Sequence, residues 1–175
     1  MTHRTLAFTL NYTPSGEKDR LYTIYTNDFG KLKLLAKGGR EIKSKLVAHL
    51  EPPVLVDCLV ARGLAIDRLA GAVAIRDFGK IRASSAHRIA ALEALRLVDW
   101  LTPYEASDRA IFDLLSNFFI YLEANDVSKD IVWLFAKKLL AITGHENKEV
   151  KTPEAIGLAI SEIVGKAYTP RAIAF

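Results

Sequence analysis

The sequence is poor in the residues that build metal sites and disulfides. Its 175 residues include one cysteine, Cys58, and four histidines that lie far apart along the chain. A single cysteine cannot close an internal disulfide, and the sequence has neither a C-x-x-C pair nor a closely spaced histidine pair to hold zinc. We therefore expect no metal and no cofactor. Cys58 lies in an apolar run, which predicts a buried and unreactive thiol.

The sequence also lacks long hydrophobic runs and catalytic motifs. The N-terminus has no apolar stretch of the length of a signal peptide, and the longest uncharged apolar-rich run, Leu114 to Leu122, is far too short to cross a bilayer. We predict a cytoplasmic protein without a membrane segment. The scattered histidines and acids show no nucleophile elbow and no paired carboxylates at a catalytic spacing, so we predict that the protein is not an enzyme.

Positive charge is concentrated in the first third of the chain. The sequence has 24 basic and 20 acidic residues, and residues 1–50 alone carry 9 basic and 4 acidic ones. Between residues 31 and 45, Glu41 is the only acid among six basic residues: Lys31, Lys33, Lys37, Arg40, Lys43 and Lys45. Such a cluster attracts polyanions, nucleic acid among them. The alternative is a solvated strand edge that its lysines keep soluble.

A glycine turn at residues 38–39 precedes the second half of this basic cluster. Residues 39–44 are similar to part of a phosphate-binding loop, but isoleucine stands where that loop needs glycine directly before Lys43. What remains are backbone N–H groups, the Ser44 hydroxyl and the cations of Arg40, Lys43 and Lys45. These groups can contact successive phosphates of a nucleic acid.

Alternation of apolar and polar residues predicts five short strands in the first 80 residues. They are expected at residues 6–12, 20–27, 31–37, 54–60 and 64–75, with turn-forming residues between them. In the third strand, Leu32, Leu34 and Ala36 share one face and the lysines share the other. A small antiparallel sheet avoids exposed edges by closing, so we predict a five-stranded barrel of the OB type. An SH3-like barrel is the alternative.

The pattern becomes helical after residue 83, where apolar residues recur every three positions up to about residue 101. Thr102 to Glu105 has the form of a capping box, which predicts a second helix from there to about residue 124. A third helix is expected after Ser128, and a fourth from Thr152 to about residue 166. The predicted fold class is therefore α+β, with the barrel in residues 1–80 and a small helical bundle in residues 81–175.

Aromatic residues are interleaved with the basic residues of the predicted sheet, namely Tyr12, Tyr22, Tyr25 and Phe29. Aromatic side chains on the face of an OB fold stack on bases, while lysine and arginine follow the phosphates. Alternation predicts that Tyr25 and Tyr12 are the most exposed of these rings. The alternative is that most of the rings fill the barrel.

The first third of the chain also matches the pattern of a known family. Three pieces follow one another: G-E-x-D at residues 16–19, T-x-x-x-G-K at residues 26–31, and A-K-G-x-R-x-x-K-S at residues 36–44. In order and spacing they resemble the N-terminal region of the bacterial recombination mediator family RecO. The resemblance is sharp over residues 6–50 and covers the rest only as a barrel followed by helices.

The resemblance implies an OB domain and a helical domain, binding of single- and double-stranded DNA, and annealing of complementary strands in DNA repair and recombination. It also implies contacts with the single-strand-binding protein and with RecR, through which recombinase is loaded onto coated DNA. By position, the DNA-binding stretch of the family corresponds to Lys31, Lys33, Lys37, Arg40, Lys43 and Lys45, with Arg20 beside them. The residue analysis adds Ser44 and Tyr25 to this predicted nucleic-acid site.

Many members of the family are longer and carry a cysteine cluster that can hold zinc. This chain has neither feature, and we interpret it as a short version of the family. The leading hypothesis is a DNA-repair mediator that works without covalent catalysis. The alternative is a protein-interaction adaptor whose basic face is only solvated.

Cations and aromatic rings coincide at few places in the helical part. The tail of the single-strand-binding protein is acidic and ends in an apolar residue with a free carboxylate, so its receptor needs an apolar pocket rimmed by cations. Lys137 and Lys138 lie one helical turn from Trp133, and Arg109 lies near the start of the preceding helix. We predict a partner site at these four residues. Alternatively, Trp133 is core and the lysines only solvate the helix end.

Overall fold

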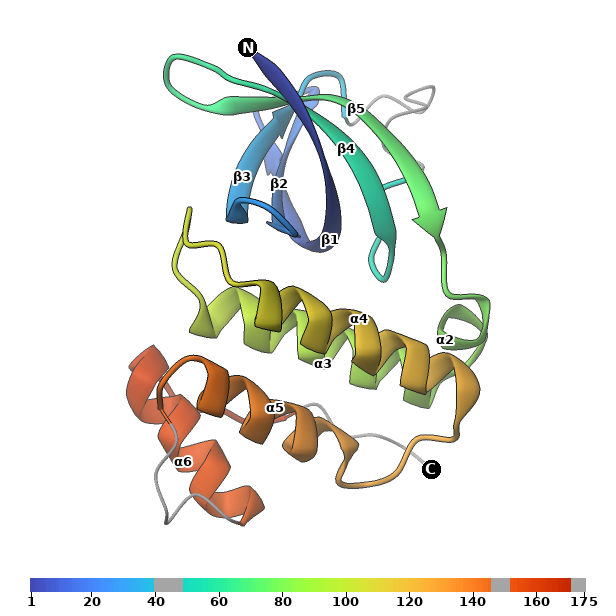
Figure 1. Ribbon diagram of the computed structural model, residues 1–175, viewed down its shortest axis with the longest axis vertical. Helices are drawn as coiled ribbons and strands as arrows, with labels where there is room; N and C mark the ends of the chain where they lie inside the picture. The colour runs from blue at the N-terminus through green and yellow to red at the C-terminus, as the bar shows by residue number, and fades with distance from the viewer. Residues whose placement is uncertain (40–48, 146–151, 171–175) are drawn as a thin grey trace. The chain divides into compact units, whose positions relative to one another are not determined.

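A computed structural model of the chain describes residues 1–39, 49–145 and 152–170 (Figure 1). Backbone contacts divide the chain into two compact units. The first unit contains Met1–Phe78 together with Pro103–Arg109, and the second contains Gly79–Thr102 and the chain from Ala110 onward. Strands build the first unit and helices build the second.

Five strands form a closed barrel in the first unit. They are β1 (Thr2–Ser15), β2 (Asp19–Thr26), β3 (Gly30–Ala36), β4 (Leu55–Ala61) and β5 (Asp67–Arg76). Around the barrel their order is β1-β2-β3-β5-β4, and β3 pairs with β5 in parallel while the other neighbours are antiparallel. The predicted five-stranded OB-type barrel is confirmed. The expected fifth strand begins later than predicted, because residues 63–66 belong to the β4–β5 loop.

Alternate strand positions supply the core of the barrel. Ile24, Leu34, Val56 and Val60 are fully buried there, as period-two alternation requires. Cys58 belongs to the same core, and burial raises the pKa of its thiol to about 12. The thiol is therefore protonated near neutral pH, and the prediction of a buried cysteine is confirmed.

The segment Pro103–Arg109, called the strap below, adds to the edge of β3. The main-chain N–H of Glu105 donates to the carbonyl oxygen of Lys31 at 2.9 Å, and Tyr104 forms an isolated parallel bridge with Lys31. The hydroxyl of Tyr25 donates to the main-chain carbonyl of Asp108 at 3.2 Å. The strap therefore belongs to the barrel unit, although helical segments precede and follow it in the sequence.

The strap contradicts the predicted capping box. Thr102 is the C-cap of α3 (Ser85–Leu101), and both its backbone N–H and its hydroxyl donate to the carbonyl of Val98, at 3.2 and 2.7 Å. Glu105 has a φ of 57°, a left-handed conformation that does not continue a helix. The next helix, α4 (Arg109–Ala124), begins only at Arg109. The prediction of a helix start at Thr102 is wrong because Thr102 ends the preceding helix.

The second unit also contains α2 (Gly79–Ala83), α5 (Ile131–Ile142) and α6 (Pro153–Val164). The short helix α2 was not predicted. The N-cap of α5 is Asp130 and not Ser128, whose carbonyl instead accepts from the N–H of Ile131 at 3.3 Å. The predicted N-cap of α6 is confirmed, because the Thr152 hydroxyl accepts from the N–H of Ala155 at 3.3 Å.

A buried carboxylate ties the last described residues to α3. Glu93 accepts a hydrogen bond from the hydroxyl of Tyr168 at 2.7 Å and pairs with the guanidinium of Arg96. Burial is the main reason why the pKa of the Tyr168 hydroxyl is raised, and the hydrogen bond to Glu93 is the second. Arg96 also donates to the carbonyl of Thr169 at 3.0 Å. These bonds compensate the burial of the Glu93 charge and fix residues 168–169 on the helix.

We predict that Gly30→Ala destabilises the barrel much more than Gly16→Ala. The two glycines have φ values of +69° and +63°, so each alanine costs on the order of 1 kcal/mol in backbone conformation. A methyl group at Gly30 would also collide with the carbonyl oxygen of Ala106, whereas nothing lies within 4 Å of one at Gly16. In urea unfolding, Gly30→Ala should therefore lower the free energy of unfolding by at least about twice as much as Gly16→Ala does. Equal losses would show that the strap does not press on Gly30.

Candidate nucleic-acid interface

The predicted basic stretch lies in part on the outer side of β3. Along this strand Leu32, Leu34 and Ala36 are buried, whereas Lys33 is exposed, and Lys37 just beyond the strand is exposed as well. The predicted separation of these lysines from the core is confirmed. The other predicted members of the stretch lie outside the described residues: Arg40, Lys43, Ser44 and Lys45.

The strap covers two other predicted residues, Lys31 and Tyr25. They are paired across β2 and β3, and both are buried. The Nζ atom of Lys31 lies 4.5 Å from the centroid of the Tyr104 ring, and this cation–π contact offsets lost hydration of the ammonium group. The expectation that Tyr25 is exposed is wrong, because its hydroxyl is bound under the strap. A ring in this position does not stack on a base.

Arg20 lies on the opposite side of the sheet from the lysines. It pairs with Ala36, its guanidinium carbon lies 4.6 Å from the centroid of the Tyr12 ring, and it donates to the Tyr22 hydroxyl at 3.5 Å. Tyr12 in turn donates to the Glu51 carboxylate at 2.9 Å, which with burial raises the pKa of Tyr12. The structure therefore separates Arg20 from the exposed lysines with which it was predicted to act.

Two arginines that sequence reasoning missed lie beside these lysines. Arg68 of β5 is exposed and pairs with Leu35 of β3, so it is a diagonal neighbour of Lys33 and Lys37. Arg62 is exposed in the β4–β5 loop. The available signal was the strand order of an OB barrel, which brings β5 next to β3. We call Lys33, Lys37, Arg62 and Arg68 the basic face.

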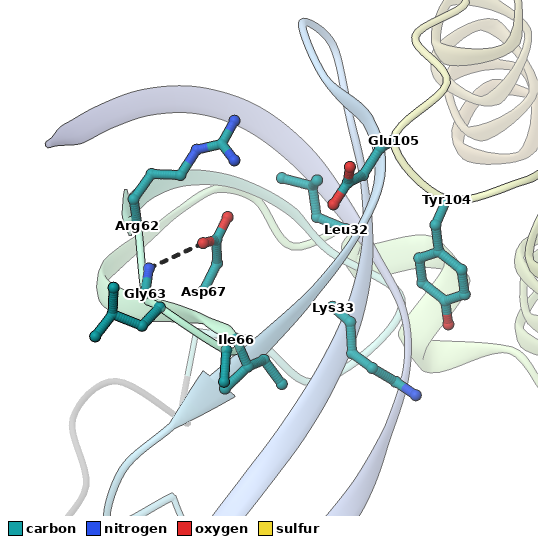
Figure 2. A pocket seen from close by; sticks show the side chains of 10 residues that line it. Leu32, Lys33, Arg62, Gly63, Ile66, Asp67, Tyr104 and Glu105 are labelled. Carbon is teal, nitrogen blue, oxygen red and sulfur yellow. Dashed lines mark hydrogen bonds between the residues drawn. The ribbon is translucent and has the colours of Figure 1, made fainter.

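A pocket of about 410 Å³ adjoins the basic face. It lies between β3, the β4–β5 loop and the strap, and Figure 2 shows it from close by. The side chains with functional groups in its lining are Lys33, Arg62, Asp67, Tyr104 and Glu105. Its volume is within the range of sites that bind small ligands. We call it the strap pocket.

Three charged groups of the strap pocket lie around one open space. Asp67 is held by the N–H of Gly63, which donates to its Oδ1 atom at 3.0 Å. The Asp67 and Glu105 carboxylates and the Arg62 guanidinium border one open space in Figure 2. Tyr104, which is 48% exposed, also lines the pocket, and the Nζ atom of Lys33 lies 5.8 Å from the centroid of its ring. The pocket therefore combines acceptors, donors and a ring.

The residues of the predicted partner site have different surroundings. Lys138 lines an apolar groove of about 410 Å³ between α4 and α5. Trp133 instead packs edge-on against Tyr168, with ring centroids 6.1 Å apart. Lys137 is exposed but does not line this groove, and Arg109 is grouped with the barrel unit. The structure thus assigns one of the four residues, Lys138, to the groove.

Among the residues that the structure describes, no three histidine, cysteine, aspartate or glutamate side chains are grouped so that they could hold a metal ion. No helix in this part of the chain combines the length and the apolar character needed to cross a membrane.

Comparison with known proteins finds one family. The family model described as Recombination protein O N terminal matches residues 1–78. The DNA repair protein RecO of Syntrophus aciditrophicus (strain SB) is 32% identical over 147 residues, which cover 82% of this chain and 56% of the relative. That of Dehalococcoides mccartyi (strain CBDB1) is 34% identical over 143 residues, with the same two coverages.

A third relative extends the similarity along the chain. The DNA repair protein RecO of Synechococcus sp. (strain JA-3-3Ab) is 28% identical over 179 aligned residues, covering 96% of this chain and 58% of the relative. The chain thus spans little more than half the length of the curated relatives it matches. The resemblance inferred from residues 16–44 is confirmed.

Buried Tyr25 gives the barrel a testable pH dependence. Burial raises the pKa of Tyr25 from 10.0 to about 12, so the folded protein keeps this proton over a range where the unfolded chain loses it. The free energy of unfolding should therefore fall as the pH rises from about 10 to about 12. We expect Tyr25→Phe to reduce this fall in urea unfolding at a series of pH values. Tyr121→Phe, which changes an exposed ring, is the control. If the free energy of unfolding of Tyr25→Phe fell with pH as steeply as that of the parent, the buried position of Tyr25 would be contradicted.

Proposed function

Because the N-terminal domain of this chain belongs to the RecO family of DNA repair proteins, we propose that the protein binds DNA through its barrel and acts as a recombination mediator. The observation that carries the proposal is the basic face. Its four cations are exposed together, and within the described ranges none of them is paired with an acid. Unpaired surface cations release counterions from the phosphate backbone when they bind it, which supplies affinity for any sequence.

In this proposal the basic face follows the phosphates of a DNA strand. Tyr104 offers a ring on which a base can stack next to that track. Arg40, Lys43, Ser44 and Lys45 follow Lys37 closely in the sequence and would lengthen the track. Contacts of this kind suit single- and double-stranded DNA alike, because both present phosphates.

Annealing then requires no covalent step. Cations that neutralise the phosphates of two strands lower the repulsion between them, so complementary bases can meet. The protein would therefore act as a binding surface in the cytoplasm, not as an enzyme, and it would need no cofactor.

The helical unit supports the second part of the proposal, which is partner binding. The groove between α4 and α5 is lined by Phe118, Leu134 and Phe135, and Lys138 contributes a cation. Leu134 is 54% exposed. An apolar groove with a cation suits the acidic tail of the single-strand-binding protein, with its apolar last residue and free carboxylate. We extend the proposal to RecR as a partner on the family relationship alone, with recombinase loading as the outcome.

The alternative function is an adaptor that binds only proteins. The α4–α5 groove is the observation in its favour, because an apolar groove is a typical docking place for a peptide. In this case the basic face is solvated and binds no oligonucleotide even at low salt.

We predict that Lys33→Glu combined with Arg68→Glu weakens DNA binding strongly. Each substitution removes one phosphate contact and adds a repelling charge. In fluorescence anisotropy with a labelled single strand, the slope of log K against log salt should become shallower by about 1.4, from about 0.7 per lost contact.

Lys18→Glu combined with Arg88→Glu is the matched control. It changes the net charge by the same amount at exposed cations outside the basic face. Equal weakening by the two double variants would mean that overall charge, and not the basic face, governs binding. If the parent protein binds no oligonucleotide at low salt, the proposal of DNA binding is wrong.

For the α4–α5 groove we predict that Lys138→Glu weakens binding of a peptide with the tail sequence of the single-strand-binding protein by about tenfold or more. The reversed charge repels the acidic peptide, and about 1.4 kcal/mol corresponds to a factor of ten. Lys137→Glu is the control, because Lys137 is the exposed neighbour that does not line the groove. Isothermal titration of both variants measures the difference. Equal peptide affinities in the two variants would remove Lys138 from the site.

A further inference from the structure

The strap pocket contains two carboxylates at a place where the proposed function expects phosphate. Asp67 and Glu105 both line it, beside Lys33 and Arg62. A carboxylate next to a phosphate track opposes binding by like-charge repulsion. These acids are therefore poor partners for the DNA backbone. A part of the ligand that donates hydrogen bonds would suit them better.

The pocket has the groups that recognise a base. Carboxylates only accept hydrogen bonds and a guanidinium only donates them. In the described chain, the side chains of Glu105 and Arg62 form no hydrogen bond or ion pair with another residue, and Asp67 uses one oxygen on the loop N–H of Gly63. Acceptors and a donor are thus available around one space, and Tyr104 is also among the residues that line the pocket. Unpaired bases of a single strand are read by hydrogen bonds of this kind on their edges.

Among the four DNA bases, guanine matches this set of groups. Its Watson–Crick edge carries two adjacent donors, N1–H and the N2 amino group, together with the O6 acceptor. A carboxylate can accept from the two donors while the guanidinium donates to O6. Adenine and cytosine would each turn a ring-nitrogen acceptor toward a carboxylate, and thymine offers a single donor between two carbonyl acceptors.

We propose that the strap pocket binds an unpaired guanine base, with Asp67 and Glu105 accepting from its N1–H and N2 amino groups and Arg62 donating to O6. This inference rests on the proposed function, because the base reaches the pocket only when its strand lies on the basic face, where Lys33, Lys37 and Arg68 contact the phosphates and Arg62 contacts the base. A strand bound there is held by sequence-independent phosphate contacts and is preferred where a guanine is unpaired. Guanines already paired in a duplex present no Watson–Crick edge to the pocket.

The test compares three labelled single strands with the full chain in fluorescence anisotropy. One is oligothymidylate, the second carries isolated dG in place of some thymidines, and the third carries deoxyinosine, which lacks the N2 amino group, at the same positions. We expect the dG strand to bind tighter than oligothymidylate by a factor on the order of ten, the effect of one good bidentate contact. The deoxyinosine strand should bind more weakly than the dG strand.

Two variants test the assigned residues. Glu105→Gln and Asp67→Asn each replace a carboxylate by an amide of similar shape, and we expect both to lose most of the preference for dG while their affinity for oligothymidylate stays the same or rises. Glu105→Gln changes an exposed side chain, so its result does not depend on the hydrogen bond that Asp67 makes to the loop. Glu17→Gln, an exposed carboxylate in the turn after β1, is the control and should keep the preference.

Each outcome bears on a different claim. Equal affinity of the parent for all three strands overturns the guanine site and leaves the proposed DNA binding intact. A preference for dG that survives in both pocket variants also overturns the site. If the parent binds none of the strands, the proposed function fails and the guanine site fails with it.

Discussion

The hydrogen bond from the N–H of Glu105 to the carbonyl of Lys31 fixes the strap on β3, and most features of the candidate interface depend on it. With the strap in this place, Tyr104 lies over the Lys31 ammonium and Glu105 lines the strap pocket. The strap lies so close to β3 at Gly30 that a residue with a Cβ does not fit at that position. Together with the bond from the Tyr25 hydroxyl to Asp108, this contact keeps Lys31 and Tyr25 covered.

Lys31 and Lys33 show how neighbouring cations on one face acquire different roles. Lys31 is 5% exposed and lies against the aromatic ring of Tyr104, so removal of its charge would remove a cation–π contact. Lys33 is exposed, so its ammonium keeps its water and can exchange it for a phosphate. Counting the basic residues of the stretch therefore overstates the number available to a ligand. A basic residue belongs to the basic face only if it stays exposed after folding.

The barrel was predictable because its information is local. Period-two alternation in residues 31–37 determines which side chains enter the core, and the turn residues between strands mark where each strand ends. The pairing of β3 with β5 brings together Leu35 and Arg68, and no local sequence pattern in either strand predicts that pairing. For this reason the sequence pointed to Lys33 and Lys37 but did not reveal their neighbours Arg62 and Arg68.

The helix boundary at Thr102 shows the opposite failure, in which a correct local motif leads to a wrong element. Threonine, proline and glutamate at residues 102–105 satisfy the requirements of a capping box. In the structure the Thr102 hydroxyl serves the end of α3, and the residues after it find hydrogen-bond partners on the barrel. A motif of a few residues cannot indicate which of two neighbouring structures will use it. Competition from β3, distant in the sequence, decides the outcome.

Because the strap follows α3 in the chain, the barrel unit is encoded in two separate stretches of the sequence. All five strands lie before residue 79, yet the cover over Tyr25 and one wall of the strap pocket come from residues 103–109. A fragment cut after Phe78 would keep every strand and expose a ring and an ammonium group that the intact chain buries. Exchange of N-terminal segments between relatives would likewise join strands of one parent to the strap of the other. Gly30 would have to be kept in any such exchange, because a Cβ at that position would collide with the main chain of residue 106.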